Sequence, residues 1–168
     1  SDPENWDNRL SQVAVGPSGE VYVSWINWNL PTPRILFDKS TDYGASFSTD
    51  IEVQSFDQIP NLQYIQRTPP SISVAVDTSG GAYNGYIYIA YPVNPPSTTD
   101  SSDIMFTRSI NGGATWSTSI RLNDDATSND QFFPALAVNP VGEIKAVWYD
   151  RRLDPGNKYI DVFRTESN

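Results

Sequence analysis

An eight-residue pattern that occurs twice constrains the fold of this chain more than any other feature. The octet reads Ser-x-(Asp/Asn)-x-Gly-x-x-(aromatic), and its two copies are residues 40–47 and 109–116. Each copy follows a short apolar run and precedes a run rich in Ser and Thr. Because both copies hold the same place within a longer repeat, they indicate that the whole chain is built from similar units.

The residue types in the octet are those of a tight turn between two strands. Its defined positions are filled by Ser40, Asp42, Gly44 and Phe47 in the first copy and by Ser109, Asn111, Gly113 and Trp116 in the second. The Asp or Asn side chain can accept hydrogen bonds from nearby backbone N–H groups, and the Ser hydroxyl can bond within the same turn. The Gly allows a positive φ, and the aromatic ring can fold back onto apolar neighbours. We therefore expect these residues to have structural roles.

The octets belong to units that recur about 60 residues apart. Each unit is predicted to hold up to four short strands separated by turn signals. The predicted strands are 13–15, 21–25, 34–37 and 49–54 in the first unit, 74–76, 87–91, 103–106 and 118–123 in the second, and 136–138, 144–148 and 160–163 in the third. In this alignment, Phe163 is the equivalent of Phe37 and Phe106. The aromatic residues Trp25, Tyr91 and Trp148 recur at the end of the second strand, which predicts a core or blade-contact position for them.

A single four-stranded sheet cannot bury both of its faces, but sheets stacked around an axis bury them against each other, as in a β-propeller. A β-sandwich is also built of short strands at regular spacing, and the repeat favours the propeller over it. No segment of useful length has a helical period. We predict an all-β fold of β-propeller-type blades, each with four antiparallel strands. One part-propeller domain spans residues 1–168, with blade one at 10–54, blade two at 70–123 and blade three at 133–168.

The third blade is predicted to be truncated before its fourth strand. Its octet would start at residues 166–168, with Glu166 in place of Ser, and is cut off there. About three blades are fewer than the 4–8 of typical propellers. We expect either a piece of a longer chain or several copies that associate through open strand edges.

Composition limits the chemistry that such a chain can carry. A net charge of −9 would repel a phosphate backbone, so we expect no nucleic-acid partner. The chain has no Cys and no His, which removes thiolate and histidine catalysis and the commonest zinc ligand. No apolar run approaches the ~20 residues of a membrane-spanning helix. Few charges and many Ser, Thr and Asn residues favour an extracellular or cell-surface location.

The octets resemble the Asp-box, also called the BNR repeat, of sialidases and related β-propellers. Phe47 replaces the usual Trp in the first copy, and Asn111 replaces the Asp in the second. The segment 133–152 is similar to blades of large secreted bacterial proteins that contain this repeat. The resemblance covers nearly the whole chain. The family includes exo-sialidases, other glycosidases, glycan-binding modules and propellers without known activity.

The resemblance does not extend to the catalytic residues of sialidases. Those enzymes use three Arg that clamp a carboxylate, a Tyr nucleophile activated by a Glu, and an Asp acid/base. Their first Arg lies in a Phe/Tyr-Arg-Ile-Pro motif, and residues 33–36 lack both its aromatic residue and its Pro. The catalytic residues are therefore unknown, and we predict a non-catalytic module that binds glycans or proteins or is structural. The alternatives are a fragment of a sialidase-like glycoside hydrolase and a self-assembling building block.

The resemblance implies that the octet turns lie on one face of the propeller and the long loops and connectors on the other, where the active sites of the family lie. Tyr149, Asp150, Arg151 and Arg152 fall on that second face and could bind a carboxylate or sugar hydroxyls. Alternatively, Asp150 and one Arg form an ion pair that braces the loop. Trp28 could stack on a sugar ring or pack between blades.

The connector at residues 123–130 is the candidate for a metal site. Asp124, Asp125 and Asp130 offer oxygen ligands of the kind that Ca²⁺ prefers. The spacing matches no EF-hand and lacks its closing Glu, so a solvated loop is the alternative. We expect no other cofactor.

Overall fold

The computed structural model describes residues 7–28, 32–65, 71–96 and 99–167, which form an all-β structure without a helix. The strands are β1 (Asn8–Val15), β2 (Val21–Asn27), β3 (Arg34–Ser40), β4 (Ile51–Ser55), β5 (Ser73–Val76), β6 (Ile87–Val93), β7 (Asp103–Ser109), β8 (Ile120–Arg121), β9 (Gln131–Val138), β10 (Ile144–Asp150) and β11 (Asp161–Glu166). In this part of the chain, no helix has the length and apolar character needed to cross a membrane.

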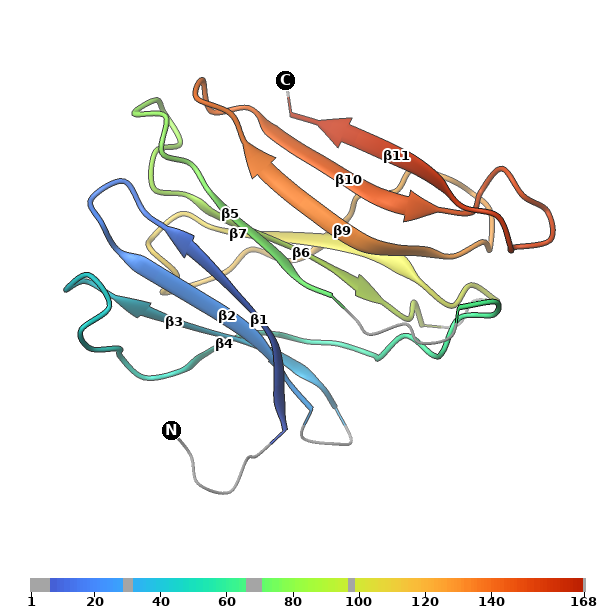
Figure 1. The fold of residues 1–168 in the computed structure, drawn as a ribbon, viewed down its shortest axis with the longest axis horizontal. Coiled ribbons are helices and arrows are strands. Elements are labelled where there is room, and N and C mark those ends of the chain that lie inside the picture. Colours follow the sequence, from blue (N-terminus) through green and yellow to red (C-terminus); the bar gives the residue numbers. More distant parts are fainter. Residues whose placement is uncertain (1–6, 29–31, 66–70, 97–98, 168) are drawn as a thin grey trace.

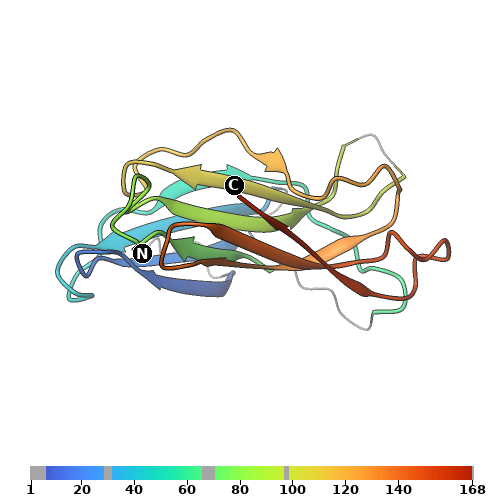
Figure 2. The same cartoon turned by 90° about the horizontal axis from the view of Figure 1, so that it is seen from above.

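The strands form three antiparallel sheets that follow the chain order. The first sheet is β1-β2-β3-β4, the second is β5-β6-β7-β8, and the third contains β9, β10 and β11 with β10 in the middle. Figures 1 and 2 show the three sheets lying against one another with their strands roughly aligned. Each sheet is one predicted unit. The all-β fold of propeller-type blades is therefore confirmed.

The second sheet is the centre of the structure because both of its faces are buried. Successive side chains of a strand point to opposite faces. Ile87, Ile89 and Tyr91 of β6 join the core between the first and second sheets, whereas Ala90 joins a smaller core with Trp148 of the third sheet. The sequence of β6 is consequently buried over nearly its whole length.

The loops gather at two ends of the stacked sheets, as Figure 1 shows. The octet turns between β3 and β4 and between β7 and β8 lie at one end, together with the β1–β2, β5–β6 and β9–β10 turns; we call this the turn end. The β10–β11 loop and the connectors from β4 to β5 and from β8 to β9 reach the opposite end, which we call the connector end.

The two octet turns are held by the same hydrogen bonds. In the first, Gly44 N donates to Ser40 Oγ at 2.8 Å, and Ser46 N donates to Asp42 Oδ1 at 2.8 Å. The second copy repeats both bonds, with Gly113 N donating to Ser109 Oγ at 2.8 Å and Thr115 N donating to Asn111 Oδ1 at 2.9 Å. Hydrogen bonds from the Ser40 and Ser46 side chains, then from the backbone, lower the pKa of Asp42 to about 2. Both glycines have a positive φ, at 90° and 87°, as predicted.

The aromatic residue of the second octet joins two sheets. Trp116 packs edge-on against Phe37 of the first sheet, with ring centroids 5.4 Å apart. Phe37 is fully buried, and a Cβ atom on Gly113 would overlap its ring. In the first octet, Phe47 is 47% exposed. The second octet is therefore both a turn and a contact to the preceding sheet, and the first octet has only the turn in common with it among the described residues.

Strand pairing corrects the predicted alignment of the third unit by one residue. Trp148 pairs with Phe163, whereas the equivalent Trp25 pairs with Leu36, so Phe163 does not correspond to Phe37. The residue that corresponds to Phe37 is Arg164, which pairs with Val147 as Phe37 pairs with Ser24. Ser40 pairs with the first residue of β2, and Ser167 N donates to O of Ile144, the first residue of β10, at 3.1 Å. Ser167, not Glu166, thus takes the place of the octet Ser. The prediction was wrong because it matched Phe to Phe, although a shift of one residue moves a side chain to the other face.

We predict that Gly113→Ala destabilises the protein more than Gly44→Ala. Both substitutions place an Ala at a positive φ, which costs about 1–2 kcal/mol. At Gly44 the nearest atom to a new Cβ is Val21 Cγ2 at 3.8 Å, so little else changes. At Gly113 the new methyl group overlaps the buried Phe37 ring, which raises the expected loss to about 2–4 kcal/mol. Urea unfolding of both variants measures the difference, and equal losses would contradict the intersheet role of the second octet.

Candidate functional site

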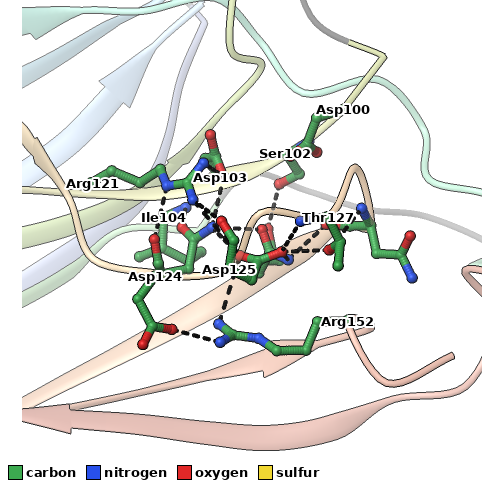
Figure 3. A network of polar contacts seen from close by, with 12 residues as sticks. Asp100, Ser102, Asp103, Ile104, Arg121, Asp124, Asp125, Thr127 and Arg152 are labelled. Carbon is green, nitrogen blue, oxygen red and sulfur yellow. Dashed lines mark hydrogen bonds and ion pairs between the residues drawn. The ribbon is translucent and has the colours of Figure 1, made fainter.

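A network of charged and polar side chains occupies the connector end between the second and third sheets. Figure 3 shows it between the start of β7, the connector from β8 to β9 and the segment that follows β10. At its centre, Asn123 Nδ2 lies 2.7 Å from Asp103 Oδ1, 2.9 Å from Asp125 Oδ1 and 2.9 Å from Gln131 Oε1. The side-chain oxygen of Asn123 accepts a bond from Ile104 N at 2.8 Å. One buried amide therefore fixes β7 relative to the connector.

Arg151 lies inside the protein. Its guanidinium forms an ion pair with Asp130 at 3.1 Å, and the two side chains are only 1% and 3% exposed. The guanidinium also lies over the Phe132 ring, 5.3 Å from its centroid. Burial raises the pKa of Asp130, while bonds from Asn157 and Arg151 oppose that rise. Arg151 therefore already has a carboxylate partner within the chain.

Arg152 also has its carboxylates supplied from within the chain. It contacts Asp150 at 2.7 Å and Asp124 at 2.6 Å, and Asp125 lies 3.7 Å away. Its guanidinium stacks over the Phe163 ring at 4.1 Å. Asp150 is fully buried and also accepts a bond from Trp148 Nε1 at 2.8 Å. This arrangement is the ion-pair brace that the sequence offered as the alternative to ligand binding.

The remaining sequence candidates divide between surface and core. Tyr149 is 43% exposed and packs edge-on against Phe132 and Phe133. Trp28 packs against the core between the first and second sheets, and its backbone N donates to Asp7 O at 2.9 Å. The ring of Trp28 is thus placed for packing between sheets, the second of its two predicted roles.

The three Asp residues proposed for calcium point to different partners. Asp124 and Asp125 contact Arg152, whereas Asp130 contacts Arg151 and accepts a bond from Asn157 Nδ2 at 2.9 Å. Within the described ranges, no group of three or more acidic, His or Cys residues is arranged to hold a metal ion. A calcium ion would have to displace arginine from these carboxylates.

A buried carboxylate at the edge of the network has an unusual protonation equilibrium. Asp100 is 8% exposed, and its burial raises its pKa to about 6. A hydrogen bond from Ser102 N at 3.0 Å opposes this rise, and the nearby carboxylates of Asp103, Asp130 and Asp125 add to it. Asp100 therefore changes its charge in mildly acidic solution.

Two residues of the network also line a cleft between the first and second sheets, with a volume of about 640 Å³. Asp103 and Arg121, which lie 3.4 Å apart, belong to both the network and the cleft. Other lining residues are the aromatic Phe56 and Tyr91 and the polar Gln54, Asn94 and Ser119. Tyr91 and Ser119 share a hydrogen bond of 2.7 Å between their hydroxyls, and burial raises the pKa of Tyr91.

Sequence reasoning did not find this cleft as a site. Its walls come from Thr32, the end of β4 with the two residues after it, the end of β6 with the following loop, the start of β7, and β8 with the two residues before it, so no single motif encodes it. The available signal was the length of the segments at 55–70 and 92–103, because long loops often carry function. Tyr91 was predicted as a core or blade-contact residue, and the structure buries it between the sheets at the side of the cleft.

Comparison with known proteins supports the fold. No protein-family model and no curated protein matches the chain. Among solved structures, an α-L-arabinofuranosidase from Fusarium graminearum aligns with a TM-score of 0.61 and 18% identity over 99% of this chain and 46% of that one. An α-L-arabinanase from Penicillium chrysogenum gives 0.62 and 19% over 96% and 46%. A protein of unknown function from Dyadobacter fermentans gives 0.64 and 12% over 96% and 51%. The chain thus spans about half the length of these similar structures.

We predict that Arg151→Ala strongly destabilises the protein because it leaves the buried Asp130 carboxylate without its cation. Loss of one partner of a buried ion pair costs about 3–5 kcal/mol. The matched control is Arg9→Ala, which breaks an ion pair with Asp7 that is shorter, at 2.5 Å, but about half-exposed. Exposed pairs contribute only about 0–1 kcal/mol. Denaturant unfolding compares the two, and a similar loss in both would refute the bracing role of Arg151.

We predict that Asp100→Asn gains stability relative to the natural protein as pH rises. The folded-state pKa of about 6 lies above the ordinary value of 3.8, so the folded state binds the proton more tightly than the unfolded state. Ionisation of Asp100 therefore destabilises the fold between these two pH values, and Asn cannot ionise. The difference in unfolding free energy between variant and natural protein should grow by roughly 1–2 kcal/mol from pH 4 to pH 7 and stay constant above. A difference independent of pH would contradict the raised pKa.

Proposed function

We propose that this chain is part of an extracellular Asp-box propeller module that binds a neutral glycan, and that the glycan lies in the cleft between the first and second sheets. The observation that carries this proposal is the lining of the cleft. Phe56, which follows β4, and Tyr91 of β6 lie beside amide, hydroxyl and carboxylate groups from neighbouring segments. A sugar presents an apolar C–H face and a rim of hydroxyls, so a cleft that combines apolar and polar groups suits it. Phe56 and Tyr91 are 6% and 2% exposed, so they contribute to the apolar wall of the cleft without an open ring face.

The aromatic wall is rigid. The rings of Phe56 and Tyr91 lie 5.7 Å apart with an interplanar angle of 55°, and the hydroxyl of Tyr91 is held by Ser119. A preformed wall loses little conformational entropy when a ligand binds. The volume of about 640 Å³ lies within the roughly 300–1,000 Å³ range of small-molecule sites.

Charge favours a neutral ligand over an acidic one. The net charge is −9, and the one arginine in the lining, Arg121, is already paired with Asp103 and also bonds to backbone oxygens of the connector. Both arginines next to Asp150 are likewise paired with carboxylates. A sialic acid or uronic acid would therefore meet no free guanidinium among these residues. Among the similar solved structures, an arabinofuranosidase and an arabinanase agree with a neutral pentose-containing glycan, whereas a polysaccharide lyase is bound to a glucuronate-containing one. The choice of a neutral ligand therefore rests on the charge of the cleft.

We predict that arabinobiose and longer linear arabinan oligosaccharides bind to the chain, and that Gln54→Ala weakens binding about tenfold because one hydrogen-bonding group is lost. Gln54 lines the cleft, whereas Gln12 is an exposed glutamine of β1 outside it. Gln12→Ala is therefore the matched control and should leave the affinity unchanged. Isothermal titration calorimetry with these sugars and a panel of other neutral oligosaccharides measures the affinities.

Two outcomes would change the conclusion. Absence of heat from every neutral oligosaccharide, or equal effects of both glutamine variants, would refute glycan binding in this cleft. Release of reducing sugar from the oligosaccharides would show that the alternative function, a glycoside hydrolase, is the correct one.

A further inference from the structure

An ion pair occurs at the same position of the first and second sheets, with its charges exchanged. In the second sheet, Asp103 is the first residue of β7, and Arg121 of β8 pairs with Met105, two residues further along the same face of β7. Strand pairing identifies the equivalent residues of the first sheet as Arg34 and Glu52. The charged atoms are 3.3 Å apart in the first sheet and 3.4 Å apart in the second. Both sheets thus have an ion pair between diagonal neighbours on two adjacent strands.

The pair of the second sheet is held in place by further hydrogen bonds. Asp103 Oδ1 accepts a bond from Asn123 Nδ2 at 2.7 Å, and Asn123 is 2% exposed. Arg121 Nε donates to the backbone oxygen of Asn123 at 2.8 Å, and its Nη2 donates to the backbone oxygen of Asp125. Figure 3 shows both members of the pair within this network. Their orientation is therefore fixed before a ligand binds, which lowers the entropic cost of binding.

Each member of this pair has one polar atom left for a ligand. Within the described part of the chain, no hydrogen bond involves Asp103 Oδ2 or Arg121 Nη1, although Nη1 lies 3.4 Å from the other oxygen of the same carboxylate. Both residues line the cleft between the first and second sheets. The cleft wall therefore has a negatively charged acceptor beside a positively charged donor.

We propose that Asp103 and Arg121 bind two adjacent hydroxyls of the glycan and so select sugar residues with a free vicinal diol. One hydroxyl donates to Asp103 Oδ2, and its neighbour accepts from Arg121 Nη1. This inference rests on the proposed glycan site and names the chemical group that the site recognises. A hydroxyl can both donate and accept, and hydrogen bonds to ionised partners are roughly twice as strong as neutral ones. Because the pair has no net charge, hydroxyls suit it better than a carboxylate does.

Arabinobiose and its 2-deoxy and 3-deoxy analogues test the proposal, because the hydroxyls at carbons 2 and 3 of a 1,5-linked arabinofuranose unit are free neighbours. Isothermal titration calorimetry should show that each analogue binds the natural protein at least about tenfold more weakly than arabinobiose, since one charge-assisted hydrogen bond is lost. Arg121→Lys retains the charge but loses the fixed guanidinium, and Asp103→Asn replaces the accepting oxygen. Each variant should lose discrimination against one analogue, and the two variants against different ones.

The first sheet provides the matched controls. Arg34→Lys and Glu52→Gln change the equivalent ion pair, whose side chains are 49% and 46% exposed and do not line the cleft. Both control variants should bind arabinobiose and its analogues as the natural protein does. Circular dichroism checks that the variants are folded, and Arg121→Lys decides alone if Asp103→Asn is not.

The outcomes separate this inference from the proposed function. Equal affinity of the natural protein for arabinobiose and both deoxy analogues would overturn the recognition of a diol and leave glycan binding intact. Full discrimination by Arg121→Lys, or an equal loss of discrimination in the first-sheet controls, would overturn the role of this pair. Absence of binding by every neutral oligosaccharide would refute the proposed function and this inference with it.

Discussion

Face-to-face packing of sheets is the constraint on which the whole structure depends. A short antiparallel sheet of this kind has two faces to cover, and among the described residues the second sheet is the one with a neighbour on both. Its strand β6 is accordingly buried along most of its length, whereas the valines of β1 and β11 that point away from the stack are more than half exposed. The second octet turn serves the same packing, because Trp116 contacts Phe37 of the preceding sheet and Gly113 leaves room for its ring.

Buried charge at the connector end determines which groups remain available for a ligand. Asp130 and Asp150 are nearly or completely inaccessible and would be unfavourable there without cations. Arg151 and Arg152 provide those cations and in turn hold the end of β10 against the connector from β8 to β9. The charged groups that look most reactive in the sequence are therefore paired with one another inside the protein. The accessible polar groups lie in the neighbouring cleft between the first and second sheets.

Much of the architecture could be predicted from the sequence because its determinants are local. Short stretches of consecutive residues encode the turns at Gly44 and Gly113, the strands and the repeated unit. The structure has these features at the expected positions. The alignment of the third unit failed at Phe163 because residue identity says nothing about which face a side chain occupies. The roles of Arg151 and Arg152 were left open for a related reason, since their partners Asp130 and Asp124 come from a different segment.

The sequence by itself determined the all-β class, the repeating unit and the absence of histidine and cysteine chemistry, because composition, turn signals and strand periodicity act over short distances. Only the tertiary structure decided which surfaces are buried, which carboxylates neutralise which arginines and where a cleft opens between sheets. These features depend on contacts between residues that are distant in the chain, such as Phe37 with Trp116 and Tyr91 with Phe56. Such contacts are set by the stacking of whole sheets.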